Sequence, residues 1–267
     1  MFEYDFMRNA FAAATVVALV SGLVGYFLVL RGQTFAGHAL AHVGFTGATG
    51  AVLVGLAPLW GLVGMTVAAG VLMGFIGEQL AQRDVAIGIV LAFSLALGLL
   101  FLHFYTSFAT HATALLFGNV LAVDVATVWI LAGLAAICLA TLAIIARPLL
   151  FASLQPELAE AKGVSLKLYS VLFLAVVALA TAECAQIVGV LLVFALMVGP
   201  AATAQKLVSG VAAGVLLSAA LALAEAWGGL TLAFYTDWPT SFWITALSTL
   251  IYVLAAAPRR TSAWHSA

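Results

Sequence analysis

Charged residues are scarce in this sequence, and their scarcity excludes most soluble folds. Only 7% of the 267 residues are charged, whereas 66% are hydrophobic, and the mean hydropathy is +1.23. An ordinary water-soluble domain carries about 25% charged residues, most of them on its surface. The composition therefore predicts a polytopic membrane protein that lies in a lipid bilayer.

Basic residues and cysteines are also few. The formal net charge is -1, so no basic patch is large enough to neutralise many phosphates, and nucleic acid is excluded as a partner. Cys138 and Cys184 lie in apolar stretches without C-x-x-C spacing, which excludes a disulfide framework and a cysteine metal site. We expect both cysteines to be packing residues.

Long hydrophobic runs make up most of the chain. About 20 apolar residues cross the hydrocarbon core of a bilayer, and the sequence holds nine such runs, separated by nearly all of the charged residues. They are residues 9–30, 34–56, 58–79, 85–104, 122–146, 168–183, 187–205, 211–229 and 240–257. Only a short polar patch around Glu183 separates the sixth run from the seventh, so these two form either two crossings or one re-entrant hairpin. The predicted fold is a single all-α domain over residues 1–267, a bundle of eight or nine transmembrane helices.

The distribution of basic residues predicts how the bundle is oriented. With nine crossings, eight of the nine Lys and Arg residues fall on one side of the membrane and only Arg8 on the other. The eight are Arg31, Arg83, Arg147, Lys162, Lys167, Lys206, Arg259 and Arg260. Because cytoplasmic loops carry the excess of Lys and Arg, we expect an external N-terminus and a cytoplasmic C-terminus.

The largest internal polar segment is Arg147–Lys167, which reads RPLLFASLQPELAEAKGVSLK. Pro156 suits the first turn of a helix, Glu157 favours the positive end of the helix dipole, and Gly163 suits a C-terminal cap. The segment predicts a helix of about two turns at the membrane surface. This helix is either an ordinary loop helix or a docking element for a cytoplasmic partner.

Four stretches together resemble one known family. They are QPELAEAKGV at 155–164, QIVGVLLVFALMVGPAATAQKL at 186–207, LLFGNVLAV at 115–123 and DWP at 237–239. In this order and spacing they resemble the metal-specific permeases of ATP-binding-cassette importers, in the branch for zinc and manganese uptake. The first stretch resembles the coupling segment of that family and the second its most distinctive helix.

The resemblance implies a permease subunit in a bacterial plasma membrane, paired with a second copy, as a homodimer, or with a close relative. It also implies that an external metal-binding protein delivers the ion. The coupling segment, about residues 150–166, would contact a cytoplasmic ATPase through Pro156, Glu157, Ala159 and Gly163. The chain itself has no G-x-x-x-x-G-K loop, so we expect a separate subunit to hydrolyse ATP and expect no enzymatic activity here. The metal ion would be a transported substrate, and no tightly bound cofactor is expected.

Two histidines stand four residues apart in FAGHALAHVGFTGATG, residues 35–50. Residues at i and i+4 lie on one face of a helix, and a rise of about 1.5 Å per residue from Arg31 places His42 near the middle of the bilayer. Polar groups at that depth are costly, so such residues are functional candidates by default. The family has an aspartate at the position of His38, so this chain keeps one ligand position, His42, and departs at the other.

The histidine pair predicts a transient metal stop on a transport pathway. Imidazole favours zinc, copper, iron or nickel, whereas manganese prefers carboxylate and water oxygens. The sequence therefore favours zinc as the transported ion, with manganese or iron as alternatives. In the other interpretation, His38 and His42 only form hydrogen bonds across a tight helix interface, which Gly44 and Gly47 make thin enough for close packing.

Gly199 and Pro200, in the stretch LMVGPAAT, predict a kink in the seventh run, because proline removes one helical hydrogen bond. The kink is either static or a hinge for alternating access. Glu183 and Glu225 are acids at the edge or in the interior of the membrane. Each either lines the path of the transported ion or is a packing residue or a water-facing charge without a role in transport.

Functions of other classes remain open at this point. Siderophore or cobalamin importers share the broad architecture but give no reason for a histidine pair inside the membrane. A proton-coupled carrier could use Glu183 and Glu225 as relays, although the chain shows no convincing internal repeat. A membrane haem protein needs facing histidines on neighbouring helices, and only His103 could partner the pair.

Overall fold

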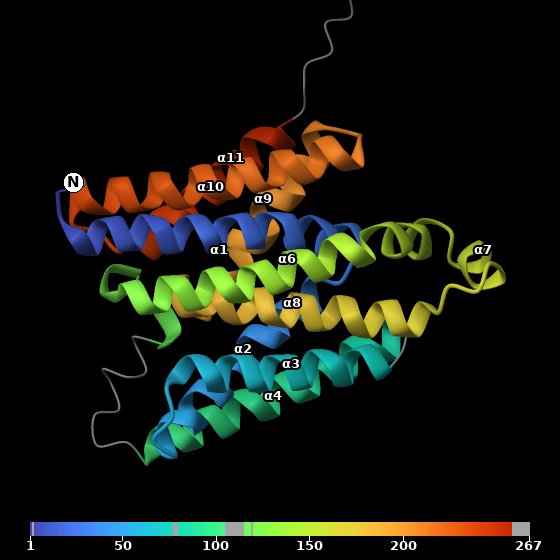
Figure 1. The fold of residues 1–267 in the computed structure, drawn as a ribbon, viewed down its shortest axis with the longest axis horizontal. Helices are drawn as coiled ribbons and strands as arrows, with labels where there is room; N and C mark the ends of the chain where they lie inside the picture. The colour runs from blue at the N-terminus through green and yellow to red at the C-terminus, as the bar shows by residue number, and fades with distance from the viewer. Residues whose placement is uncertain (2, 77–79, 105–114, 119, 258–267) are drawn as a thin grey trace, which may run out of the picture.

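Long helices run back and forth between two ends of the molecule (Figure 1). The computed structural model describes residues 1, 3–76, 80–104, 115–118 and 120–257. Its helices are α1 (Asp5–Leu30), α2 (Thr34–Leu53), α3 (Pro58–Ile76), α4 (Leu80–His103), the 3₁₀ helix η1 (Val120–Ala122), α6 (Val125–Leu154), α7 (Pro156–Ala161), α8 (Leu166–Val188), α9 (Val193–Leu207), α10 (Val211–Thr236) and α11 (Thr240–Ala256).

Each of the nine predicted hydrophobic runs corresponds to one long helix. Five of the described helices, α1, α3, α6, α8 and α10, are long and apolar enough to cross a membrane by length and composition. α9 has 15 residues and is therefore only about 22 Å long at 1.5 Å per residue, shorter than the hydrocarbon core. The seventh run is thus too short as a helix to cross the bilayer by itself.

The predicted break around Glu183 is wrong. Glu183 lies inside α8, which continues to Val188 and ends where Gly189 adopts a φ of +85°. A glycine reaches this left-handed conformation at little cost, which stops the helix there. In the sequence, Glu183 looks like a polar residue at a helix boundary. The helix in fact ends six residues later, at Gly189.

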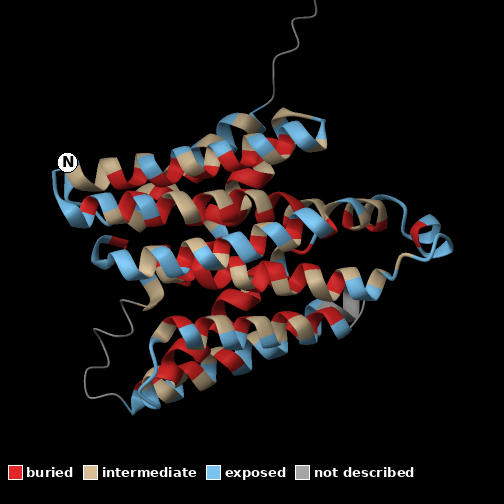
Figure 2. Ribbon diagram, viewed as in Figure 1, coloured by how far each residue is buried: buried red, intermediate tan, exposed pale blue. Residues whose placement is uncertain are grey.

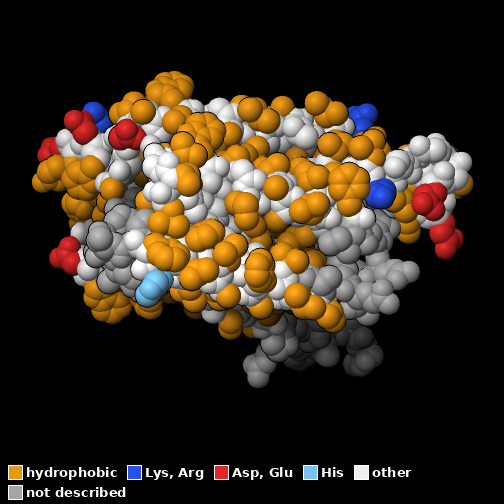
Figure 3. All heavy atoms as spheres, turned by 90° about the horizontal axis from the view of Figure 1, so that it is seen from below, with side chains coloured by type: hydrophobic (Ala, Val, Ile, Leu, Met, Phe, Trp, Pro, Cys, Tyr) orange, Lys and Arg blue, Asp and Glu red, His pale blue; other side chains and the backbone are white. Residues whose placement is uncertain are grey.

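The outer surface between the two ends is apolar. Figure 3 shows hydrophobic side chains over the middle of the molecule and the charged ones at its ends. Large apolar side chains such as Trp129 and Ile144 of α6 are exposed on this surface. Buried residues lie where helices face one another (Figure 2). Such an exterior suits contact with lipid chains rather than water.

α2 lies inside the bundle, where it contacts α1, α3, α4, α8 and α9. Small residues permit the close contacts that the sequence predicts for this helix. A Cβ atom on Gly47 would lie 2.1 Å from the carbonyl oxygen of Gly61 in α3, so neither position has room for a side chain. This interior position accounts for the low hydropathy of α2, because other helices separate most of it from lipid.

The two ends of the bundle differ in charge. Five basic side chains lie at the end that carries α7, as the alternation of the helices places them. They are Arg31, Arg147, Lys162, Lys167 and Lys206. Arg8 lies at the opposite end with Asp5, to which it is ion-paired. Arg259 and Arg260 lie outside the described residues, as does the side chain of Arg83. The predicted side of the membrane for these three basic residues therefore stays a prediction from the sequence.

Asp124 and two tryptophans mark the end opposite α7. The Asp124 carboxylate caps α6 by accepting a hydrogen bond from the Thr127 backbone N–H at 2.9 Å. Hydrogen bonds from Thr127 hold the pKa of this carboxyl below its ordinary value. Trp238 stacks on Trp243 with ring centroids 5.5 Å apart, as is typical of aromatic residues at a membrane interface.

Candidate functional site

His38 and His42 lie on one face of α2, as their spacing predicts. Their ring centroids are 4.8 Å apart and their planes meet at 83°. His42 is buried, with 9% of its surface exposed, and His38 is half-buried. The described part of the chain offers no hydrogen-bond partner to Nδ1 of His42. This nitrogen is therefore a buried polar atom without a partner, which makes it a candidate metal ligand.

The other buried polar side chains of α2 are satisfied. The Thr46 hydroxyl donates a hydrogen bond to the backbone carbonyl of Ser94 in α4. The Thr49 hydroxyl donates one to the Phe45 carbonyl at 3.0 Å. Burial of an unpaired polar atom is costly, and on this helix it occurs at His42. The interpretation in which the histidines only bridge helices needs a partner for this nitrogen, and no described residue provides one.

The histidine pair opens toward one surface of the chain. The ring of His38 packs edge to face against Phe194 of α9, with centroids 5.8 Å apart. Phe194 is 43% exposed, and Phe35, one turn before His38, is 37% exposed. The histidine face of α2 is therefore the side on which this helix reaches the outside of the subunit.

The pair would supply two ligands to a metal ion. Among the described residues, no three His, Cys, Asp or Glu side chains form a group that could hold a metal ion. Glu183 of α8 and Glu225 of α10 are both completely buried, which places them inside the bundle rather than at its edge. Two imidazoles suit a transient stop, because a full set of four protein ligands is typical of structural sites that keep their metal.

Gly199 and Pro200 lie inside α9, which remains helical through both residues. Here α9 packs tightly on α11. The Ser248 hydroxyl donates a hydrogen bond to the Ala195 carbonyl at 3.1 Å. A Cβ atom on Gly199 would lie only 1.8 Å from the same hydroxyl oxygen. The predicted hinge is therefore held by a direct contact in this conformation.

This contact gives a stability prediction. Gly199→Ala is expected to lower the free energy of unfolding by about 1–3 kcal/mol, because the added methyl group overpacks the α9–α11 contact. Thermal unfolding of the purified protein in detergent measures the change. Ser248→Ala in the same chain should restore part of the loss by removing the obstructing oxygen. Gly64→Ala is the matched control, since nothing lies within 4 Å of its Cβ position, and an equal loss there would contradict the account.

The predicted surface helix is present as α7, six residues that begin at Pro156. Gly163 ends it with a φ of +82°. The Gly163 and Val164 N–H groups donate hydrogen bonds of 2.9 Å to the carbonyls of Glu160 and Ala159, a pattern that satisfies the last carbonyls of a helix. Figure 1 shows α7 projecting beyond the end of the bundle.

The side chains of α7 divide into an inner and an outer set. Ala159 is completely buried against the rest of the protein, whereas Glu157 is exposed. Leu158 is 46% exposed although it is a large apolar residue. Sequence reasoning missed Leu158, because a helix of one to two turns is too short for its hydrophobic pattern to reveal which side faces outward.

Comparison with known proteins shows the family of this chain. The family model described as the ABC 3 transport family matches residues 3–259. The chain belongs to the ABC 3 transport family. This confirms the resemblance drawn from the four sequence stretches.

Relatives within the ABC 3 transport family match almost the whole chain. The manganese transport system membrane protein MntC of Listeria monocytogenes is 29% identical over 96% of this chain and 91% of its own length. The manganese import system permease protein ScaB of Streptococcus gordonii is 30% identical over 95% of this chain and 91% of its own length.

A solved structure supports the fold of this ABC 3 chain. PsaBC from Streptococcus pneumoniae in complex with Fab has a chain that superposes with a TM-score of 0.85 at 28% identity, covering 94% of this chain and 91% of that one. The match confirms the predicted all-α membrane bundle. The chain is thus a multi-pass membrane permease of the ABC 3 transport family.

Proposed function

We propose that this chain is the transmembrane subunit of an ATP-driven importer that carries a divalent transition metal ion into the cell. The observation that carries the proposal is the histidine pair of α2, where an unpartnered ring nitrogen of His42 lies inside a membrane helix. A metal ion is the partner that such a nitrogen lacks. Membership of the ABC 3 transport family supports transport as the role of the site.

Two ions are favoured by different observations. The relatives MntC and ScaB are named for manganese, so manganese is our first candidate, and the sequence-based preference for zinc has no support from them. Zinc is the second candidate, because the His38 and His42 rings lie side by side on α2, with centroids 4.8 Å apart. Imidazole nitrogen suits zinc better than manganese.

Competition between the two metals separates these candidates. Uptake of radioactive manganese is measured in cells that express the chain with its ATPase and external binding protein, in the presence of excess zinc, and then with the metals exchanged. Stronger inhibition by manganese supports the first candidate and stronger inhibition by zinc the second. Inhibition by neither metal would contradict both.

The residue at position 38 is expected to set the preference. His38→Asp adds a carboxylate one turn from His42, so we expect the ratio of manganese to zinc uptake to rise about tenfold, which corresponds to about 1.4 kcal/mol. His38→Gln is the matched control, because it removes the imidazole without adding a charge. An unchanged ratio in His38→Asp, at normal expression, would show that His38 is not a ligand.

We also propose an arrangement of partners around this subunit. A second copy would face the side that holds Phe35, His38 and Phe194 across the transport pathway, so that two histidine pairs would line one pathway. The cytoplasmic ATPase would bind α7, and the external binding protein would bind the opposite end. The basic residues at the α7 end support this orientation, with the N-terminus outside and the C-terminus in the cytoplasm.

A further inference from the structure

The turn between α8 and α9 lies next to the histidine pair in space. α8 ends at Val188, residues 189–192 are not helical, and α9 begins at Val193. Phe194, which packs on His38, is the second residue of α9. The position of the turn therefore determines where the phenyl ring lies relative to the histidines.

Residues 115–118 hold this turn through backbone contacts. The Val190 and Leu191 N–H groups donate hydrogen bonds of 3.2 Å to the carbonyls of Leu115 and Leu116. Next to these hydrogen bonds the two backbones cross at Gly118 and Gly189, which both have positive φ. A Cβ atom on Gly189 would lie 2.3 Å from the backbone nitrogen of Gly118. The two backbones touch directly, so a shift of one displaces the other.

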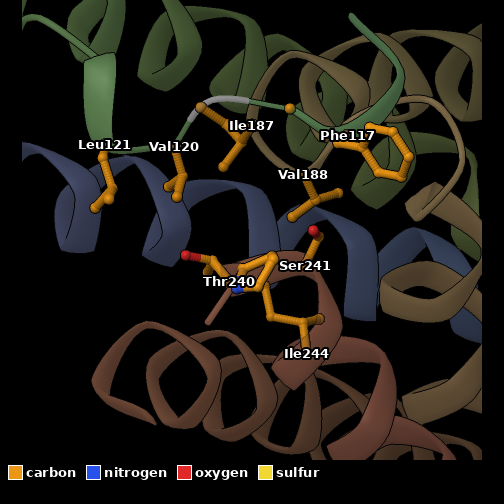
Figure 4. A pocket seen from close by; sticks show the side chains of 10 residues that line it. Phe117, Val120, Leu121, Ile187, Val188, Thr240, Ser241 and Ile244 are labelled. Carbon is orange, nitrogen blue, oxygen red and sulfur yellow. The ribbon is translucent and has the colours of Figure 1, made fainter. Parts of the chain in front are cut away.

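A cavity of about 210 Å³ adjoins the crossing (Figure 4). Its walls come from Phe117 and Val120 on one side, from Val188 at the end of α8, and from Ser241 and Ile244 of α11. The cavity, which is partly open to the outside, leaves space beside the crossing into which it can move.

Phe194 itself is fixed on one side only. Its ring contacts His38, while 43% of its surface is exposed. A half-exposed phenylalanine at the first turn of a helix loses less packing when it rotates than a fully buried aromatic side chain does. The ring can therefore cover His38 or leave it.

We propose that Phe194 is the gate of the histidine pair, and that the crossing of Gly118 and Gly189 couples this gate to residues 115–118. A shift of residues 115–118 moves the turn at 189–192, and the start of α9 then carries Phe194 toward or away from His38. Phe117 is exposed beside the crossing, so a protein that docks on this face can drive the movement. The gating role rests on the proposed transport function, whereas the mechanical link does not.

Thiol labelling tests the gate without any transport. His38→Cys places a thiol under Phe194, and the native Cys138 and Cys184 are completely buried, so they give a low background. The rate of modification by a small water-soluble thiol reagent is measured in membranes. Phe194→Ala in this chain is expected to raise the rate about tenfold, because the cover is removed.

A matched control separates the gate from a general loosening of the bundle. Phe93→Ala truncates an aromatic side chain that is 67% exposed on α4, and we expect it to leave the rate unchanged. A rate in Phe194→Ala within twofold of the parent would overturn the gate. An equal rise in Phe93→Ala would overturn it as well.

The coupling step has its own variants. Ser241→Leu fills the cavity, which Gly118 also lines, without changing either glycine. It is expected to lower the labelling rate at least threefold, because the crossing loses its room to move. Gly189→Ala forces the two backbones apart and is expected to raise the rate. An unchanged rate in Ser241→Leu would overturn the coupling even if Gly189→Ala fails to fold. If the labelling rates change as expected but the protein takes up no metal, the proposed transport function is contradicted. The coupling between residues 115–118 and Phe194 is then still supported.

Discussion

His42→Ala is expected to reduce metal uptake more than about 100-fold. The variant removes the buried ring nitrogen that has no partner within the described structure and leaves His38 as a single half-buried ligand. Loss of even an outer-shell partner lowers metal affinity by about 10- to 100-fold, so loss of a direct ligand should cost more. Radioactive manganese and zinc uptake at equal expression measures the effect.

His103→Ala is the matched control for this prediction. His103 lies exposed at the end of α4, away from the pair on α2, and its replacement should leave uptake within about twofold of the parent. Normal uptake in His42→Ala would show that the histidines are packing residues. In that case the metal assignment would rest on family membership alone.

Leu158→Glu is expected to abolish association with the ATPase and to lower uptake at least tenfold. Leu158 is an exposed leucine on α7, the helix that projects from the bundle. An apolar side chain in the buried centre of an interface commonly contributes more than 1 kcal/mol, and a carboxylate there would also be desolvated. Copurification of the ATPase with the permease measures the association directly.

Val125→Glu serves as the control for the α7 variant. Val125 is an exposed apolar residue at the first position of α6, at the opposite end of the bundle. Replacing an exposed apolar side chain by glutamate at this end should leave copurification of the ATPase unchanged. Full copurification with Leu158→Glu would exclude α7 as the principal docking element, whereas loss in both variants would indicate general misfolding.

The sequence predicted the helices well and their boundaries less well. Hydrophobic length alone located a described helix for each of the nine predicted runs, and five of these helices are long and apolar enough to cross a membrane by length and composition. It misplaced the end of α8, since a buried Glu183 and a polar loop look alike in a sequence. Gly189 was overlooked as a helix end, because the apolar run continues on both sides of it, and its close contact with Gly118 cannot be read from a local stretch of sequence.

Those parts of the site that lie close together in the sequence were predictable, whereas contacts between distant segments were not. Helical spacing alone placed His38 and His42 on one face, and Pro156 and Gly163 marked the limits of α7. Phe194 is more than 150 residues from His38 in the sequence, so no local pattern could associate them. The exposure of Leu158 likewise depends on how α7 packs against the bundle.

ATP-dependent metal uptake into proteoliposomes tests the central claim most directly. The permease is reconstituted with its ATPase and supplied with its binding protein and radioactive manganese or zinc. We predict accumulation of one of these metals that requires ATP and is lost in His42→Ala. Failure of both metals to accumulate above the ATP-free level, with an ATPase that is bound and active, would contradict the assignment of this chain as a metal importer subunit.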